Sequence, residues 1–257
     1  MVSAWEAIVM GIVQGLTEFL PVSSSGHLVI IQTLLGFDSS EMIRFNIFVH
    51  VGTLLAVFVA FWGDIKALLL KPFQRLTLLL IIGTIPAALM GLFLNDIFAM
   101  LFGSLIAVGL ALIITGLLLL ISDRFNGTKS IDDMSLGAAA MVGIFQGLAI
   151  TPGLSRSGST IFGSLLAGLK REEAARFAFL LSIPIILGAG AYEALDLITA
   201  DGMDWQWTYL LGALAAAACG YLAIRIFLRL LTKRNLRYFS YYCWTIAAII
   251  LISQLVA

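Results

Sequence analysis

Long apolar segments alternate with short polar breaks along most of the chain, and this pattern predicts a bundle of membrane helices. Runs of about 17 to 25 apolar residues are long enough to cross a bilayer as a helix. Six segments are expected to span the membrane: residues 42–62, 76–94, 101–122, 174–195, 207–231 and 238–256. No room remains for a separate soluble domain, so residues 1–257 are expected to form a single membrane domain.

Two further apolar segments are interrupted by helix-breaking residues. Residues 4–20 run into a proline and three serines, and only ten mostly apolar residues follow, at 28–37. Such a segment is too short to cross a bilayer. Residues 136–150 and 160–169 repeat this plan around a break at 152–158. Each pair predicts a re-entrant helical hairpin, whose irregular tip must be covered by protein or by a water-filled cavity.

The two hairpins are related by an internal duplication. When the chain is shifted on itself by 132 positions, eight of the sixteen residues at 11–26 meet identical residues at 143–158. The same shift pairs three later residues with identical ones: Glu41 with Glu173, Arg44 with Arg176, and Phe45 with Phe177. Repeat 1 is therefore expected at about residues 1–125 and repeat 2 at about 133–257, separated by the polar stretch 123–135.

The parity of the crossings predicts how the repeats are oriented. One hairpin and three spanning helices give each half an odd number of crossings, which inverts the second half. Short cytoplasmic loops are enriched in Lys and Arg. Two loops carry basic residues: Lys66, Lys71 and Arg75 in one, and Arg225, Arg229, Lys233, Arg234 and Arg237 in the other. One connection is acidic and carries Glu193, Asp196, Asp201 and Asp204. The sequence thus predicts an all-α integral membrane protein with inverted-topology repeats and both termini outside.

Composition supports this class and excludes others. The chain is 61% hydrophobic and 12% charged, with a mean hydropathy of +1.04, far from the globular range. Its formal net charge is zero, so no basic face for nucleic acid is indicated. The first apolar segment lacks a preceding basic region, so a removable signal peptide is not expected.

The polar residues of the hairpin tips are the candidates for chemistry. Ionisable groups inside a membrane are costly and usually face a cavity, so Glu18, His27 and Arg156 are expected to form one site. Glu18 could orient a proton-transfer residue or hold a divalent cation. Alternatively, it is a structural acid that accepts hydrogen bonds from the serine-rich turn.

Three serines, Ser23, Ser24 and Ser25, precede His27 on one short turn. A serine becomes a useful nucleophile when a base such as histidine takes its proton. Small residues that permit close helix packing are the alternative interpretation. His50 has no such neighbours and is interpreted as a hydrogen-bonded helix histidine.

Arg156 lies in the segment PGLSRSGST at residues 152–160. A guanidinium can bind phosphate through two hydrogen bonds, and nearby hydroxyls and glycine amides add donors. A salt bridge to Glu18 that joins the hairpins is the alternative, and both can hold in the resting protein. Under the shift of 132, Glu18 aligns with Ile150, so the duplication divides the chemistry between the halves.

These motifs resemble those of the BacA/UppP family of bacterial undecaprenyl-diphosphate phosphatases. Gln14 and Glu18 match a signature of Glu or Gln followed four residues later by Glu. Residues 23–27, SSSGH, match the serine and histidine region, and residues 152–160 match PGxSRSxxT throughout. The resemblance covers the full chain. Position 14 carries the amide variant, which leaves one carboxylate in the first signature.

The resemblance implies hydrolysis of undecaprenyl diphosphate to undecaprenyl phosphate, the lipid carrier of cell-wall peptidoglycan synthesis, and an association with bacitracin resistance. It also implies a multi-pass protein of the bacterial inner membrane whose site opens to the periplasmic side. A divalent cation, Mg²⁺ or Ca²⁺, is expected as cofactor, with Glu18 as a ligand. The expected partners are the polyprenyl diphosphate and membrane lipids, and a homodimer is compatible with this interpretation.

The expected mechanism assigns a role to each motif residue. Ser24 attacks the terminal phosphorus, His27 takes its proton, and Glu18 orients His27 or the cation. Attack by Ser23 and direct attack by water are the alternatives. Arg156 grips the diphosphate. The other expected substrate-binding residues are Gln14, Ser23, Ser25, Gly153, Ser155, Ser157 and Thr160. The chief rival function is a polyprenyl-phosphate transporter that uses the same phosphate site, and a third reading is a purely structural membrane protein.

Overall fold

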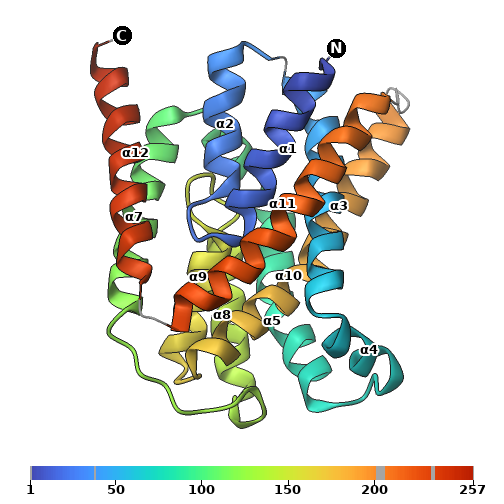
Figure 1. Cartoon of the computed structure of the whole chain (residues 1–257), viewed down its shortest axis with the longest axis vertical. Helices are drawn as coiled ribbons and strands as arrows, with labels where there is room; N and C mark the ends of the chain where they lie inside the picture. The colour runs from blue at the N-terminus through green and yellow to red at the C-terminus, as the bar shows by residue number, and fades with distance from the viewer. Residues whose placement is uncertain (1, 38, 201–205, 233–234, 257) are drawn as a thin grey trace.

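The protein is a bundle of helices in the computed structural model, which describes residues 2–37, 39–200, 206–232 and 235–256 (Figure 1). Within these ranges there are twelve α-helices and a single 3₁₀ turn, and no strand longer than an isolated bridge. The helices are α1 (Ala4–Phe19), α2 (Ser24–Leu35), α3 (Ser39–Ala60), α4 (Trp62–Leu70), α5 (Arg75–Phe93), α6 (Asn95–Phe102), α7 (Leu105–Ser122), α8 (Leu136–Leu148), α9 (Arg156–Leu166), α10 (Arg171–Ala200), α11 (Trp207–Thr232) and α12 (Leu236–Val256).

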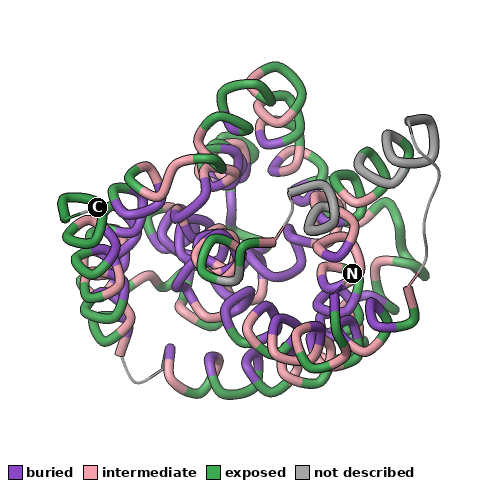
Figure 2. Tube along the Cα trace, turned by 90° about the horizontal axis from the view of Figure 1, so that it is seen from above, coloured by how far each residue is buried: buried purple, intermediate pink, exposed green. Residues whose placement is uncertain are grey.

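Five of the described helices are long and apolar enough to cross a membrane. These spans are Arg75–Phe93, Leu105–Ser122, Arg171–Tyr192, Trp207–Leu231 and Leu236–Val256. A sixth crossing results if α4 and the part of α3 from Arg44 to Ala60, which meet at 83°, count as one. Seen from above, exposed residues lie on the outer faces of the helices and buried ones where helices meet (Figure 2). The chain is therefore a multi-pass membrane protein.

Two predicted segments need correction. The segment predicted at 42–62 is α3, but it bends sharply at Phe61 and continues as α4. The segment predicted at 101–122 is divided, because α6 ends at Phe102 and α7 begins only at Leu105. Ser104 separates them, and its side chain accepts the N–H of Ala107 at 3.2 Å as the N-cap of α7.

The second arms of both hairpins begin earlier than predicted. The sequence placed their starts at residues 28 and 160, whereas α2 begins at Ser24 and α9 at Arg156. Ser23 and Ser155 are their N-caps, and their side chains accept the backbone N–H groups of Gly26 and Gly158. The serine-rich segments are therefore largely first helical turns, because a serine N-cap satisfies one of the donors exposed there.

Each hairpin packs along a long helix from the other half of the chain. The most extensive contacts join α1 to α11, α3 to α11, α7 to α12 and α5 to α8. Glycines allow these close approaches: a Cβ on Gly11 would lie 2.3 Å from the carbonyl oxygen of Gly212, and one on Gly143 would lie 2.2 Å from that of Gly83. Any larger side chain at these positions would push the helices apart.

An aromatic cluster underlies the turn that follows α1. Phe179 of α10, which is 2% exposed, makes edge contacts with Phe19 and Phe227 at centroid distances of 5.7 and 6.0 Å. Phe61 lies 5.8 Å away on a third side. Such pairs add about 0.5–1.5 kcal/mol each beyond the area that they bury. The cluster thus fixes the end of α1 next to Glu18.

Both termini lie at one end of the molecule, and α4 lies at the other (Figure 1). Residues 123–135 connect α7 to α8 and contain the 3₁₀ turn Ile131–Asp133. Four charged residues used in the topology prediction, Asp201, Asp204, Lys233 and Arg234, lie outside the described residues.

Candidate functional site

The turns after α1 and α8 meet near the centre of the molecule (Figure 1). The backbone N–H of Gly153 donates to the Ser23 hydroxyl oxygen at 3.1 Å, and the Ser157 hydroxyl donates to the Leu20 carbonyl at 3.3 Å. Ser23 has φ of 68° and Gly153 has φ of 93°, a region that favours glycine. The two hairpin tips are therefore joined by direct hydrogen bonds.

Helix α7 stabilises the second tip, which is the turn between α8 and α9. The Thr115 hydroxyl donates to the Gly153 carbonyl at 2.9 Å, and its oxygen accepts the N–H of Ser155 at 3.0 Å. A Cβ on Gly153 would lie 2.4 Å from the Val108 carbonyl oxygen of the same helix. Only glycine fits there, which explains its place directly before the arginine turn.

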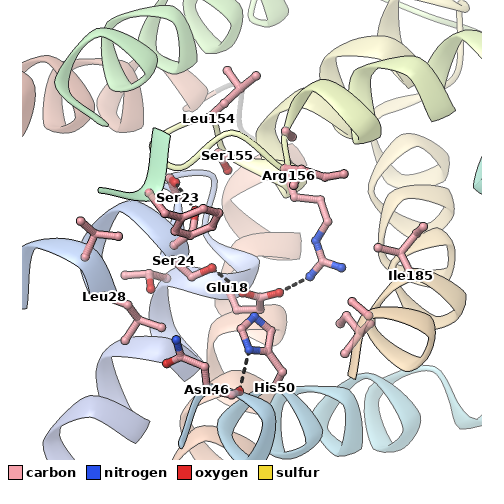
Figure 3. Close-up of a pocket in the computed structure, with 18 of the residues that line it drawn as sticks. Glu18, Ser23, Ser24, Leu28, Asn46, His50, Leu154, Ser155, Arg156 and Ile185 are labelled. Carbon is pink, nitrogen blue, oxygen red and sulfur yellow. Dashed lines mark hydrogen bonds and ion pairs between the residues drawn. The ribbon is translucent and has the colours of Figure 1, made fainter. Parts of the chain in front are cut away.

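Glu18 is the centre of the polar cluster (Figure 3). Its Oε1 pairs with Nη2 of Arg156, and its Oε2 accepts hydrogen bonds from the Ser24 hydroxyl and, at 2.9 Å, from Nε2 of Gln14. The side chains of Glu18 and Arg156 are 3% and 19% exposed. Burial of both charges is costly unless they are paired, so carboxylate and guanidinium stabilise each other here.

A cavity of about 260 Å³ opens beside this cluster and combines two kinds of wall. Glu18, Ser24 and Arg156 lie at its polar part, where α2 and α9 both begin. The remaining wall is mostly apolar and includes Leu28, Val29, Phe102, Leu154, Ile185 and Ile186. The cavity is therefore suited to an anionic group attached to an apolar chain.

The structure brings together about half of the predicted site residues. Those that line the cavity are Glu18, Ser23, Ser24, Ser25, Ser155 and Arg156. Gln14 and Gly153 do not line it, but they donate hydrogen bonds to Glu18 and Ser23, which do. Ser157 and Thr160 line a smaller adjoining space behind Arg156, where the Thr160 hydroxyl donates to the Arg156 carbonyl at 2.8 Å. These two residues therefore support the arginine turn.

The expected contact between His27 and Ser24 is not made. Nδ1 of His27 lies 2.8 Å from the Ser23 carbonyl, and Nε2 lies 2.8 Å from the Tyr242 hydroxyl. The rings of His27 and Tyr242 are also stacked. His27 is outside the cavity lining. The hydroxyl of Ser24 is hydrogen-bonded to Glu18 instead, and His27 reaches Tyr242 of α12.

His50 and Gln146 are among the cavity residues that the sequence did not assign to the site. Nδ1 of His50 is 2.7 Å from the Asn46 carbonyl, which confirms the predicted hydrogen-bonded helix histidine, and its ring lies beside Glu18 in Figure 3. In the sequence, His50 is a single histidine in an apolar helix, so nothing in its own surroundings distinguishes it. Gln146 could have been found from the duplication, since it is the counterpart of Gln14.

The cavity fits a divalent cation only in a limited way. Within the described residues, no group of three His, Cys, Asp or Glu side chains could hold a metal. Glu18 provides the hard oxygen ligands that Mg²⁺ and Ca²⁺ prefer, but both of its oxygens already have protein partners. A cation here would therefore take most of its ligands from a bound phosphate compound.

Known proteins match this chain over nearly its whole length. A family model described as bacitracin resistance protein BacA matches residues 7–249. The undecaprenyl-diphosphatase of Alkaliphilus metalliredigens is 43% identical over 98% of this chain and 99% of the relative. The proteins of the same name from Halothermothrix orenii and Carboxydothermus hydrogenoformans are each 44% identical over at least 96% of both chains. A chain with this match and these relatives belongs to the BacA family of bacitracin resistance proteins.

Proposed function

We propose that the protein hydrolyses undecaprenyl diphosphate to undecaprenyl phosphate and inorganic phosphate, and so returns this lipid carrier to cell-wall synthesis. The observation that carries the proposal is the hydrogen bond from the Ser24 hydroxyl to Glu18, beside Arg156, in a cavity with an apolar wall. The names of its relatives as undecaprenyl-diphosphatases support the same substrate.

Arg156 and two helix N-termini would bind the diphosphate. The guanidinium has five N–H donors, and the contacts described use Nη2 for Glu18 and Nη1 for the Ser182 carbonyl at 3.5 Å. The remaining donors suit phosphate oxygens. Helices α2 and α9, of 12 and 11 residues, both begin at the cavity, and a helix N-terminus favours an anion.

Ser24 would attack the terminal phosphorus while Glu18 accepts its proton. The bond from phosphorus to the bridging oxygen then breaks, and undecaprenyl phosphate leaves. Arg156 stabilises the charge on the phosphoryl group as this happens. Glu18 replaces His27 as the base in this scheme because it is the group that Ser24 contacts. His27 then serves to position the turn, through its bond to the Ser23 carbonyl.

The divalent cation expected from the family would be held by Glu18 together with oxygens of the diphosphate. When bound there, it would supply positive charge against the phosphate groups. The described residues do not build a complete cation site, so cation and diphosphate are expected to bind together.

The membrane topology proposed is an inverted repeat with two re-entrant hairpins, α1–α2 and α8–α9. Its support is the spacing of the helices. The first residues of α1, α2, α3 and α5 are 4, 24, 39 and 75, and those of α8, α9, α10 and α11 are 136, 156, 171 and 207. Each pair differs by 132, the shift that aligns the two motifs. The bacterial inner membrane, a site open to the periplasm and a homodimer remain parts of this proposal.

The decisive experiment separates hydrolysis from transport. Purified protein is given undecaprenyl diphosphate, and released phosphate is measured for the wild type and for Arg156→Ala. The proposal expects release by the wild type and almost none by the variant. If the wild type releases no phosphate with either Mg²⁺ or Ca²⁺, but moves labelled polyprenyl phosphate across vesicle membranes, the transporter hypothesis is correct.

A further inference from the structure

Gln146 is a buried amide in the wall of the cavity, and it has no hydrogen-bond partner in the part of the chain that the structure describes. It is 1% exposed, and neither Oε1 nor Nε2 has a hydrogen-bond partner among the described residues. It lines the same cavity as Glu18, Ser24 and Arg156. A buried polar group left unsatisfied costs about 1–3 kcal/mol, and native proteins rarely leave both ends of one amide in this state. This side chain is therefore built to meet a ligand.

The duplication explains why Gln146 differs from its counterpart. Gln14 has Glu18 one helical turn later, and its Nε2 donates to that carboxylate. Gln146 has Ile150 at the corresponding position, so no local acceptor takes its amide. The aligned glutamine thus supports the carboxylate in one half, and in the other it lines the cavity with no partner among the described residues.

The chemistry of the amide restricts what it can bind. Nε2 donates hydrogen bonds, and Oε1 accepts them. A fully ionised phosphate group offers acceptors alone, so it can satisfy Nε2 but not Oε1. A water molecule next to a phosphoryl group completes the set: the water donates to Oε1, and a phosphate oxygen accepts from Nε2. Both amide atoms are unpaired, so this argument holds whichever way the amide is oriented.

We propose that Gln146 holds the water molecule that releases phosphate from Ser24. This inference rests on the proposed function and deepens it. The water oxygen forms a new bond to the phosphorus of phosphorylated Ser24, and the bond from phosphorus to Oγ breaks. One water proton returns to the Ser24 oxygen through Glu18, which has by then released the serine proton to solvent. The other proton stays on the departing phosphate.

The test uses Gln146→Met, which keeps the length of the side chain and removes both unpaired polar atoms. Wild type and variant are mixed with undecaprenyl diphosphate, and both products are followed from the first turnover. We expect undecaprenyl phosphate to appear in a burst of one equivalent per protein. Phosphate release should fall about a hundredfold or more, as when a group that orients reacting atoms is lost. Mass spectrometry should then find phosphate on Ser24.

Stability provides a second readout that a structural role would not reproduce. Removing unsatisfied buried polar atoms should leave the melting temperature of Gln146→Met unchanged or higher. Ser164→Ala is the matched control, because Ser164 is also fully buried, has no side-chain partner among the described residues and does not line the cavity. It should hydrolyse at the wild-type rate. Gln146→Ala repeats the test with a smaller side chain if the methionine packs poorly.

The outcomes are distinct. If Gln146→Met and Gln146→Ala release phosphate at the wild-type rate, or if both products slow together without a phosphorylated serine, Gln146 does not hold this water. If the wild type itself releases no phosphate, the proposed function is wrong rather than the role of Gln146.

Discussion

Removing the Ser23 hydroxyl should loosen the junction of the two hairpin tips. Its oxygen accepts the backbone N–H of Gly26 at 3.3 Å within its own turn and that of Gly153 at 3.1 Å across the junction. Ser23→Ala loses an N-cap, which costs about 1 kcal/mol. It also leaves the buried Gly153 donor unsatisfied, which costs a further 1–3 kcal/mol or so. The expected total is about 2–4 kcal/mol.

Ser135→Ala isolates the local part of this effect. Ser135 is the N-cap of α8, where its oxygen accepts the N–H of Ala138 at 3.1 Å, and it makes no described bond to another segment. Its loss should cost only about 1 kcal/mol. In a protein of this size, 1 kcal/mol changes the melting temperature by about 2–4 °C. Thermal unfolding in one detergent should therefore rank the wild type first, Ser135→Ala second and Ser23→Ala last.

Hydrolysis should also depend on the junction of the two hairpin tips. Ser23→Ala lets Ser24 and Arg156 separate, and a displacement of about 1 Å between reacting groups can cost a hundredfold in rate. Ser135→Ala should hydrolyse like the wild type. Equal melting temperatures for the two variants, with full activity in both, would show that the bond from Gly153 does not hold the tips together.

Three further predictions address the groups around the cavity. Glu18→Gln keeps the shape of the base but cannot take the serine proton, so phosphate release should fall about 10²–10⁴-fold, and an unchanged rate would exclude Glu18 as the base. His27→Ala should lower the melting temperature by the equivalent of about 1 kcal/mol and slow turnover. Tyr242→Phe, which keeps the stacked ring, should remain mostly active. A faster turnover by His27→Ala than by Tyr242→Phe would refute a positioning role for His27. A chelator should stop hydrolysis without changing the melting temperature of the substrate-free protein, and a clear loss of stability would instead indicate a resident cation.

The sequence predicted the breaks between α1 and α2 and between α8 and α9, and it offered the pairing of Glu18 with Arg156 as one interpretation. Prolines, glycines and serines mark both turns, and a buried carboxylate and guanidinium are expected to pair. The start of α2 was placed four residues late, although a serine before a helix is a common N-cap. The predicted contact of His27 with Ser24 is also wrong, because in the structure His27 reaches Tyr242.

Other parts of the site depend on packing that no local pattern records. His50 reaches the cavity because α3 lies against α1 and α11. Gln14 and Gln146 align under the shift of 132, but Gln14 donates to Glu18, whereas the residue four positions after Gln146 is Ile150. The sharp bend between α3 and α4 likewise has no proline or glycine at its centre, Phe61.

The central claim is that Ser24, activated by Glu18 next to Arg156, breaks the diphosphate. The most direct measurement is phosphate release from undecaprenyl diphosphate by Ser24→Ala, with Ser25→Ala, a change to the neighbouring hydroxyl of the same turn, as its control. Release by Ser24→Ala should fall to background at saturating substrate, while Ser25→Ala keeps a readily measurable rate. Wild-type turnover by a correctly folded Ser24→Ala would contradict the account.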